Sequence, residues 1–240
     1  MLKEKKIKVC FIGNPNVGKS TLINRLLNSN VLQTSEHPGT TKSIIEKKLI
    51  WNEKEFTFLD TAGVYKKKDF NFNLLVKATR FSDIIILILD SSIDKLDKIH
   101  KKLAAHTLKS GKGLIIIFNK WDLIQNKKNK KNKLEKLIKN SLPQFDERKL
   151  IYISALRDTK FLRIFKYSIE IKKLLKSKMT TSNLNKWLRD IIRLKPPIRI
   201  KGKEIKFKYI VQTDTNPPTF KIFSNYPNKI NSSYKRFLEK

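Results

Sequence analysis

The sequence predicts an α/β domain with a mostly parallel sheet and helices on both faces, followed by a small α+β domain. Two observations lead to this prediction. Short apolar runs, such as IIILIL at 84–89 and LIIIF at 114–118, alternate with amphipathic stretches, which is typical of parallel strands buried between helices. Towards the C-terminus this alternation gives way to one helical stripe and two short alternating segments. We therefore expect domains at 1–178 and 179–240.

The first domain is expected to contain a regular series of strands and helices. Within it, 43–51 and 54–60 surround the polar pair Asn52 and Glu53, which predicts a hairpin and the single antiparallel edge of the sheet. The Asn- and Lys-rich run at 126–133 is expected to be a solvated basic loop rather than a contact for phosphates. The other elements expected are strands at 7–13, 84–90, 113–120 and 150–155 and helices at 19–29, 93–110, 132–142 and 160–178.

The second domain is expected to be a helix, two strands and a helix. Thr180 to Ser182 can cap a helix whose apolar stripe runs from Leu184 through Trp187, and the prolines at 196–197 end it. The strands are expected at 204–213 and 217–225, and the last helix begins at 233.

The chain is strongly basic in both parts. It holds 53 Lys and Arg against 21 Asp and Glu, a net charge of +32, and the last 61 residues alone hold 14 against 4. A polyanionic partner, RNA above all, is the functional interpretation, and a compositional preference for Lys, Ile and Asn is the alternative.

The rest of the composition excludes several classes. Cys10 is the only cysteine, so no internal disulfide can form, and the three histidines have no metal-ligand spacing. No apolar run approaches the ~18 residues of a membrane span, and the N-terminus lacks a long signal-peptide core. We expect no membrane span and a cytoplasmic protein.

GNPNVGKS at 13–20 matches G-x-x-x-x-G-K-[ST] between an expected strand and an expected helix, the context in which such a loop binds phosphates. Lys19 is placed to neutralise the β- and γ-phosphates and Ser20 to ligate magnesium. Gly13 and Gly18 let the backbone wrap the phosphate. The residues expected to contact nucleotide here are Gly13, Asn14, Pro15, Asn16, Val17, Gly18, Lys19, Ser20 and Thr21.

Two further stretches are expected to lie beside the phosphates. Asp60 follows the apolar strand FTFL and would hold magnesium through water, while the amide of Gly63 would face the γ-phosphate. Thr41, or Thr40, would offer a hydroxyl to the same magnesium ion. The contacts expected from this second strand end are Asp60, Thr61, Ala62, Gly63 and Val64.

FNKWD at 118–122 predicts the base. The Asp122 carboxylate can accept hydrogen bonds from guanine N1 and N2, a pattern adenine cannot satisfy, while Asn119 braces the loop and the Lys120 stem covers the ring. ISAL at 153–156 can present a backbone amide to guanine O6. The base contacts expected are Asn119, Lys120, Trp121, Asp122, Ser154, Ala155 and Leu156, so that GTP or GDP is the predicted ligand.

Together these motifs resemble the TrmE, Era and Der group of GTPases, and most closely the second GTPase domain and KH-like domain of the Der (EngA) family. The stretches that carry the resemblance are GNPNVGKSTLINRLL, PGTTKS, DTAGVYKK, NKWDL, ISAL, NPPTFKIFSN and SYKRFLE. It implies a GTP-hydrolysing switch that binds the ribosome and its rRNA and assists large-subunit assembly. The family's TTRD is TTKS here, so Lys42 and Ser43 depart from the family's pattern.

The resemblance also implies a potassium ion, held by Asn16, in place of a polar residue at Val64; a plain turn asparagine is the alternative. Lys19, Asn16, Thr41 and Gly63 are then the expected catalytic residues. The resemblance further implies that the KH-like domain lacks its last strand. It leaves open a second GTPase domain on another chain as a partner, because Der proteins carry two.

Two other functions stay open at this point. One is a GTP-gated module that binds RNA or the ribosome with little or no hydrolysis, and the other is a degenerate remnant held together by a partner chain. Gly202 is the only glycine after Gly113, so the G-x-x-G clamp of KH domains is impossible. RNA contacts would rest on basic residues, namely Arg199, Lys201, Lys203, Lys206 and Lys208, with Lys66 to Lys68 as a weaker candidate.

Overall fold

The computed structural model describes most of the chain in two compact units that divide after Lys173. Because the units are separate bodies, each is described by itself. None of the helices in the described part is both long enough and apolar enough to cross a membrane. The described residues are 6–28, 32–37, 45–60, 76, 79–199, 202, 204–215 and 218–239, with the side chains of 32–37, 45 and 60 left out.

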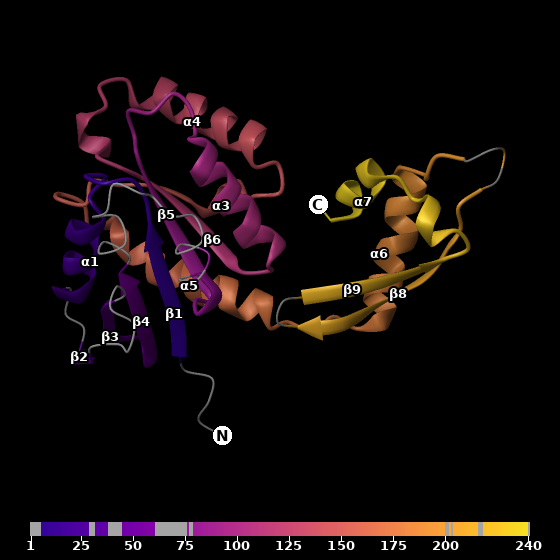
Figure 1. The fold of residues 1–240 in the computed structure, drawn as a ribbon, viewed down its shortest axis with the longest axis horizontal. Helices are drawn as coiled ribbons and strands as arrows, with labels where there is room; N and C mark the ends of the chain where they lie inside the picture. The colour runs from indigo at the N-terminus through magenta and orange to yellow at the C-terminus, as the bar shows by residue number, and fades with distance from the viewer. Residues whose placement is uncertain are drawn as a thin grey trace. The chain divides into compact units, whose positions relative to one another are not determined.

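A seven-stranded sheet forms the centre of the first unit (Figure 1). Its order is β2-β3-β4-β1-β5-β6-β7, and every neighbouring pair from β4 to β7 is parallel. This confirms the predicted mostly parallel α/β fold. The strands are β1 (Lys6–Ile12), β2 (Leu32–His37), β3 (Ile45–Trp51), β4 (Lys54–Asp60), β5 (Ile84–Asp90), β6 (Gly113–Asn119) and β7 (Leu150–Tyr152).

Helices cover both faces of this sheet. On one face, α3 and α4 lie side by side and bury Leu103 and Leu134 against Cys10 and Leu87 (Figure 1). The opposite face carries Phe56, which packs edge-on against Phe165 of α5. Strands buried on both faces explain the continuous apolar runs in the sequence. The helices of this unit are α1 (Lys19–Asn28), α3 (Lys98–Lys109), α4 (Lys127–Ser141) and α5 (Arg163–Leu175).

The sheet edge is wider than expected. The β3–β4 hairpin forms as predicted around Asn52 and Glu53, which both have positive φ, 46° and 60°. However, β2 pairs antiparallel with β3 beyond it, so the hairpin is not the outermost element. The short polar sequence LQTSEH has no apolar run, which is why the sequence did not predict this strand.

Two helix boundaries also differ from prediction. The expected basic loop at 126–133 is wrong: α4 begins at Lys127, and Asn126 caps it by accepting a hydrogen bond from the Asn129 amide at 3.1 Å. Lysine is a good helix former, so a polar lysine run does not exclude a helix. In contrast, α3 begins at Lys98 rather than at 93, because the segment after β5 turns back on Asp90.

The second unit holds the expected helix, strand, strand and helix: α6 (Thr181–Leu194), β8 (Phe207–Thr215), β9 (Pro218–Ser224) and α7 (Ser232–Leu238). Thr180 is the N-cap of α6, as predicted. Leu184, Leu188 and Ile210 form the core, whereas Trp187 is 36% exposed. The boundary at 178/179 stays a prediction.

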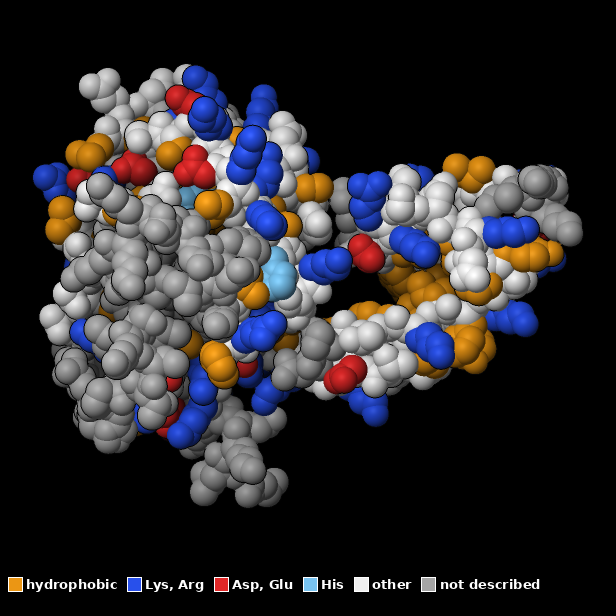
Figure 2. Space-filling view, viewed as in Figure 1, with side chains coloured by type: hydrophobic (Ala, Val, Ile, Leu, Met, Phe, Trp, Pro, Cys, Tyr) orange, Lys and Arg blue, Asp and Glu red, His pale blue; other side chains and the backbone are white. Residues whose placement is uncertain are grey.

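Charge is distributed over both units rather than confined to one. In the view of Figure 2, Lys and Arg side chains are spread over both parts and Asp and Glu are fewer. Of the basic residues proposed for RNA, Arg199, Lys206 and Lys208 are exposed, and Lys201 and Lys203 lie outside the described residues.

Candidate guanine-nucleotide site

The loop at 13–20 joins the end of β1 to the start of α1, as the motif requires. A Cβ at Gly13 would lie 2.3 Å from the Ile88 carbonyl oxygen, so the strand behind it leaves no room for a side chain. Gly18 has φ +92°, and a Cβ there would lie 2.2 Å from Asn119 Nδ2. Both glycines are therefore needed for a tightly curved loop pressed against β5 and β6.

Lys19 is held inside this loop. Its Nζ donates hydrogen bonds to the carbonyl oxygens of Gly13 at 2.9 Å and Asn14 at 2.8 Å, and the residue is only 6% exposed. The adjacent Ser20 is exposed in the first turn of α1. This geometry puts a cation and a hydroxyl at the N-terminus of a helix, where phosphate oxygens are favoured.

Asn119, the last residue of β6, connects the loop at 13–20 to the loop after β7. Its Nδ2 donates to the Val17 carbonyl oxygen at 2.7 Å, and its Oδ1 accepts from the Ala155 amide at 2.8 Å. The side chain is buried, and its own carbonyl oxygen accepts from the Ser91 amide at 2.9 Å. The brace predicted for Asn119 from the sequence thus has two specific partners.

The segment after Asn119 turns back sharply. Lys120 has a left-handed backbone, φ 62° and ψ 34°, and its Nζ contacts Asp90 Oδ2 at 2.8 Å. Burial opposes the charge on Asp90, but hydrogen bonds from Lys120 and Ser92 outweigh it, so the pKa of Asp90 lies below its usual value. The Trp121 amide donates to the Ile153 carbonyl oxygen at 3.0 Å. This hydrogen bond holds the backbone just before Asp122 against the residue that follows β7.

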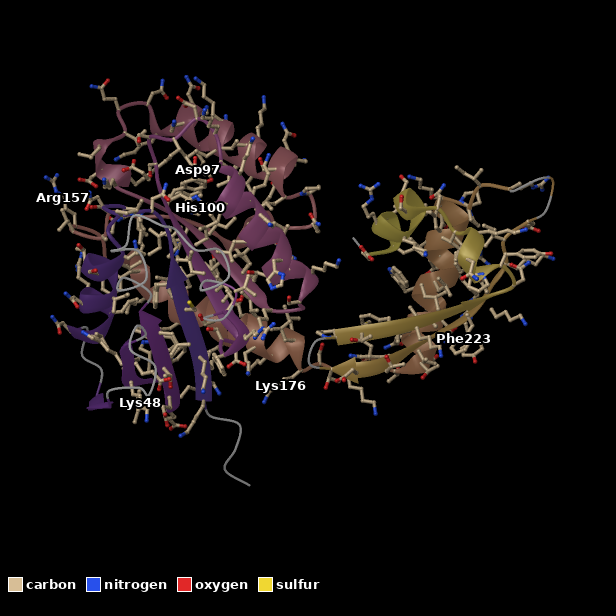
Figure 3. All side chains as sticks on the ribbon, viewed as in Figure 1. Lys48, Asp97, His100, Arg157, Lys176 and Phe223 are labelled. Carbon is tan, nitrogen blue, oxygen red and sulfur yellow. The ribbon has the colours of Figure 1, made fainter. Side chains whose placement is uncertain are left out.

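Asp122 and the loop at 154–158 lie together. The Asp122 carboxylate is 19% exposed, and the nearest cation in the described part is Arg157 Nε, 3.9 Å from Oδ2. The Ser154 amide donates to Asp158 Oδ2 at 2.9 Å, and Arg25 of α1 donates from Nη1 to the Ala155 carbonyl oxygen at 3.0 Å. Figure 3 shows Arg157 on this loop. Arg25, Asp90 and Asp158 were not predicted from the sequence.

A second connection runs from the loop at 13–20 to α3. Asn14 Nδ2 donates to Asp97 Oδ2 at 3.0 Å, and the same oxygen lies 3.6 Å from His100 Nδ1 (Figure 3). His100 is 1% exposed, and its Nε2 has no hydrogen-bond partner in the described part of the chain. The pKa of His100 lies below its usual value. Burial is the main cause, the charge of Lys19 lowers the pKa further, and the charge of Asp97 raises it.

Part of the predicted site lies outside the described residues. This applies to Thr40, Thr41, Lys42, Ser43, Thr61, Ala62, Gly63, Val64 and Lys66 to Lys68. The backbone of Asp60 is described and pairs with Phe11 of β1, so β4 ends at the same edge of the sheet as the loop at 13–20. Asn16 is exposed, with φ 63°, a conformation compatible with either interpretation of this residue.

Two family models match the chain. Residues 8–120 match the family described as 50S ribosome-binding GTPase, and residues 178–240 match the family described as the KH-domain-like C-terminal part of EngA bacterial GTPase enzymes.

Curated relatives match nearly the whole chain. GTPase Der of Natranaerobius thermophilus is 34% identical over 243 residues, which is 98% of this chain and 55% of the relative. GTPase Der of Mycoplasma capricolum subsp. capricolum is 35% identical over 245 residues, 99% of this chain and 56% of the relative. The chain therefore spans about half the length of the curated relatives it matches.

Solved structures of Era share the fold. Era in complex with MgGDPNP and nucleotides 1506–1542 of 16S ribosomal RNA has a TM-score of 0.53 and 26% identity, covering 98% of this chain and 85% of that one. Aquifex aeolicus Era bound to GDP and AlF4⁻ has a TM-score of 0.53 over 92% of this chain and 78% of that one, and at 23% identity it supports the fold alone.

Proposed function

Because this chain belongs to the Der (EngA) family of GTPases, with a GTPase domain before a KH-like domain, we propose that it is a GTP-hydrolysing switch that binds the ribosome. The observation that carries the nucleotide half is the Asn119 side chain, which connects the loop around Lys19 to the loop beside Asp122. A ligand with phosphates at one end and guanine at the other matches this pair of loops.

The proposal assigns separate predicted residues to the phosphates, the base and the metal ion. Lys19 neutralises the β- and γ-phosphates, and Asp122 accepts from guanine N1 and N2. Magnesium fits the donors present, because it prefers oxygen ligands and the Ser20 hydroxyl is exposed beside Lys19. Ser20, Asp60 and Thr41 would hold it, and when bound it would spread the charge of the phosphates.

Potassium belongs to the proposal through Asn16. The family resemblance gives Val64 no role in orienting water, so another group has to supply positive charge or orientation near the transferring phosphate. Asn16 sits in an exposed part of the loop at 13–20. We assign it as the ligand of a monovalent cation.

The ribosomal half of the proposal has separate support. One matching family is described as 50S ribosome-binding, Era has been solved with 16S ribosomal RNA, and this chain carries a net charge of +32. We propose that the protein acts in the cytoplasm, binds the large subunit and its rRNA in the GTP form and assists its assembly. A second GTPase domain, in the same or another chain, is a further proposed partner, because the relatives are about twice as long.

GTP turnover in potassium against sodium tests the hydrolysis. We expect at least a tenfold faster rate in potassium, which corresponds to about 1.4 kcal/mol of barrier, and Asn16→Ala should abolish the difference. Asn24→Ala is the matched control, since Asn24 is exposed on α1. Near-zero rates in both salts with GTP still bound would refute the hydrolase and favour a GTP-gated RNA-binding module.

Ribosome binding is tested by co-sedimentation with isolated large and small subunits. We expect the protein to pellet with the large subunit in the presence of a non-hydrolysable GTP analogue and less so with GDP. Equal pelleting with both nucleotides would argue against a nucleotide-controlled switch.

A further inference from the structure

Arg25 lies in the last turn of α1 but contacts the loop that follows β7. Its Nη1 donates to the Ala155 carbonyl oxygen at 3.0 Å, across 130 positions of sequence. The guanidinium also lies over the ring of Phe161, 4.8 Å from its centroid, and Phe161 is itself 5% exposed. The arginine is thus held both by an aromatic ring and by a hydrogen bond to a main-chain carbonyl oxygen.

The amides of this loop are nearly all occupied. Those of Ser154 and Ala155 donate to Asp158 Oδ2 and Asn119 Oδ1, and those of Arg157 and Asp158 donate to the Ser154 carbonyl oxygen. Within 154–158, the Leu156 amide is the one for which the described residues offer no acceptor. The Leu156 side chain is 74% exposed, so this residue faces away from the core.

The Ala155 carbonyl and the Leu156 amide belong to the same peptide unit. A trans peptide is planar, with its C=O and N–H pointing in opposite directions. Anchoring the carbonyl oxygen to Arg25 therefore also fixes the direction of the Leu156 N–H. Asn119 accepts from the Ala155 amide, which belongs to the preceding peptide unit, so two successive peptide units of this loop are each held by a hydrogen bond.

We propose that Arg25 is a positioning residue for guanine recognition, which aims the Leu156 amide at guanine O6. The inference rests on the proposed function, because it concerns the same nucleotide site. It divides base recognition into two independent parts: Asp122 contacts N1 and N2, and the peptide anchored by Arg25 contacts O6.

Equilibrium binding of GDP, 6-thio-GDP and IDP to the full chain distinguishes the O6 contact from the Asp122 contact. In 6-thio-GDP a sulfur, which accepts hydrogen bonds weakly, replaces O6, while IDP lacks only the 2-amino group that Asp122 contacts. The ratio of GDP to 6-thio-GDP affinity therefore reports the O6 contact, and the ratio of GDP to IDP affinity reports Asp122. Neither measurement requires hydrolysis.

Arg25→Ala should lower GDP affinity about two- to tenfold, the range of one neutral hydrogen bond, and bring the GDP to 6-thio-GDP ratio towards one. The GDP to IDP ratio should stay at the level of the unaltered chain. Arg25→Lys, which keeps a donor, should restore part of the first ratio. Arg163→Ala, at an exposed arginine that begins α5, should change neither ratio.

A role limited to stability would lower the melting temperature and weaken all three diphosphates equally, and that result would overturn the proposal. So would a GDP to 6-thio-GDP ratio in Arg25→Ala equal to that of the unaltered chain. Failure of the unaltered chain to bind GDP would overturn the proposed function together with this inference, whereas GDP binding without turnover would leave Arg25 to be judged by the ratios alone.

Discussion

Lys120 adopts a left-handed backbone, φ 62° and ψ 34°, which costs a residue with a side chain about 1–2 kcal/mol. The strain is offset by contacts that need this conformation: the Lys120 ammonium reaches Asp90, and the next amide, that of Trp121, donates to Ile153. The turn also carries the chain from the buried strand β6 to Asp122 within three residues. Backbone strain at this position therefore fits a recognition role.

His100 should make the stability of the first unit depend on pH. The side chain is buried, and its pKa is lowered from the ordinary 6.5, so the folded protein resists protonation where the unfolded chain does not. The unfolded state then binds more protons below about pH 6.5, and the free energy of unfolding falls as the pH drops through this range.

The variant His100→Asn keeps a donor for Asp97 but does not titrate. We expect urea unfolding to show a smaller loss of stability between pH 7.5 and 5.5 in this variant than in the unaltered protein. His106→Asn, at a partly exposed histidine of the same helix, is the control and should show the same loss of stability between these two pH values as the unaltered protein. If the free energy of unfolding falls equally with pH in His100→Asn and in the unaltered protein, His100 is not the source of the pH dependence.

At this scale the sequence predicted the side chains that belong to motifs and missed those that support them. Lys19, Asn119 and Asp122 have fixed spacing from glycines and strands, so the pattern identifies them. Arg25 donates to the Ala155 carbonyl oxygen, 130 positions away in the sequence, and Asp158 accepts from the Ser154 amide of its own loop. Such contacts depend on how the strands are ordered, and no spacing in the sequence encodes that order.

The β3–β4 hairpin contains an unfavourable residue in its turn. Asn52 and Glu53 both have positive φ, as in the two-residue turns that match the twist of a hairpin. Asparagine tolerates this conformation and glycine suits it, but glutamate does not.

Glu53→Gly should therefore raise the free energy of unfolding by about 0.5–1 kcal/mol, after allowing for the extra freedom of glycine in the unfolded chain. Chemical denaturation measures it. Glu53→Ala is the matched control, because it removes the same side chain without relieving the backbone, and it should give no gain. A gain of equal size in both variants would locate the effect in the side chain instead.

The elements themselves were predicted where an apolar period was clear. Strands β5 and β6 are buried along their length, and their sequences are almost purely apolar. The start of α4 and the whole of β2 were missed for the opposite reason, because both are polar. In α4 the fully buried residues are Leu134 and Ile138, and Leu137 packs beside them. Such segments are held by their neighbours, as when Lys130 Nζ donates to the Ile93 carbonyl oxygen at 2.8 Å.

The whole molecule carries 32 more positive than negative charges, and this excess should destabilise the compact state by self-repulsion. Added NaCl should therefore raise the melting temperature by a few degrees, on the order of 3 °C for each 1 kcal/mol of repulsion removed. Most of the rise should come between 20 and 200 mM, where the screening length falls to below about 8 Å.

The dependence of the melting temperature on NaCl concentration distinguishes charge screening from salting-out. Screening levels off above this range, whereas a general salting-out effect on apolar burial would continue to rise towards molar salt. The added salt is NaCl rather than KCl, so that screening is measured separately from the proposed binding of potassium at the nucleotide site. A melting temperature that does not change below 200 mM would indicate that the basic residues are too far apart to repel one another.

The Asn119 side chain also determines when during folding the nucleotide site can appear. Its two partners lie 102 and 36 positions away in the sequence, so neither half of the site is braced until β6 has paired into the sheet. We therefore expect a chain in which β6 has not yet paired to lack a braced site for the proposed nucleotide. Bound nucleotide would then slow hydrogen exchange across the central strands, since every global opening has to release the ligand first.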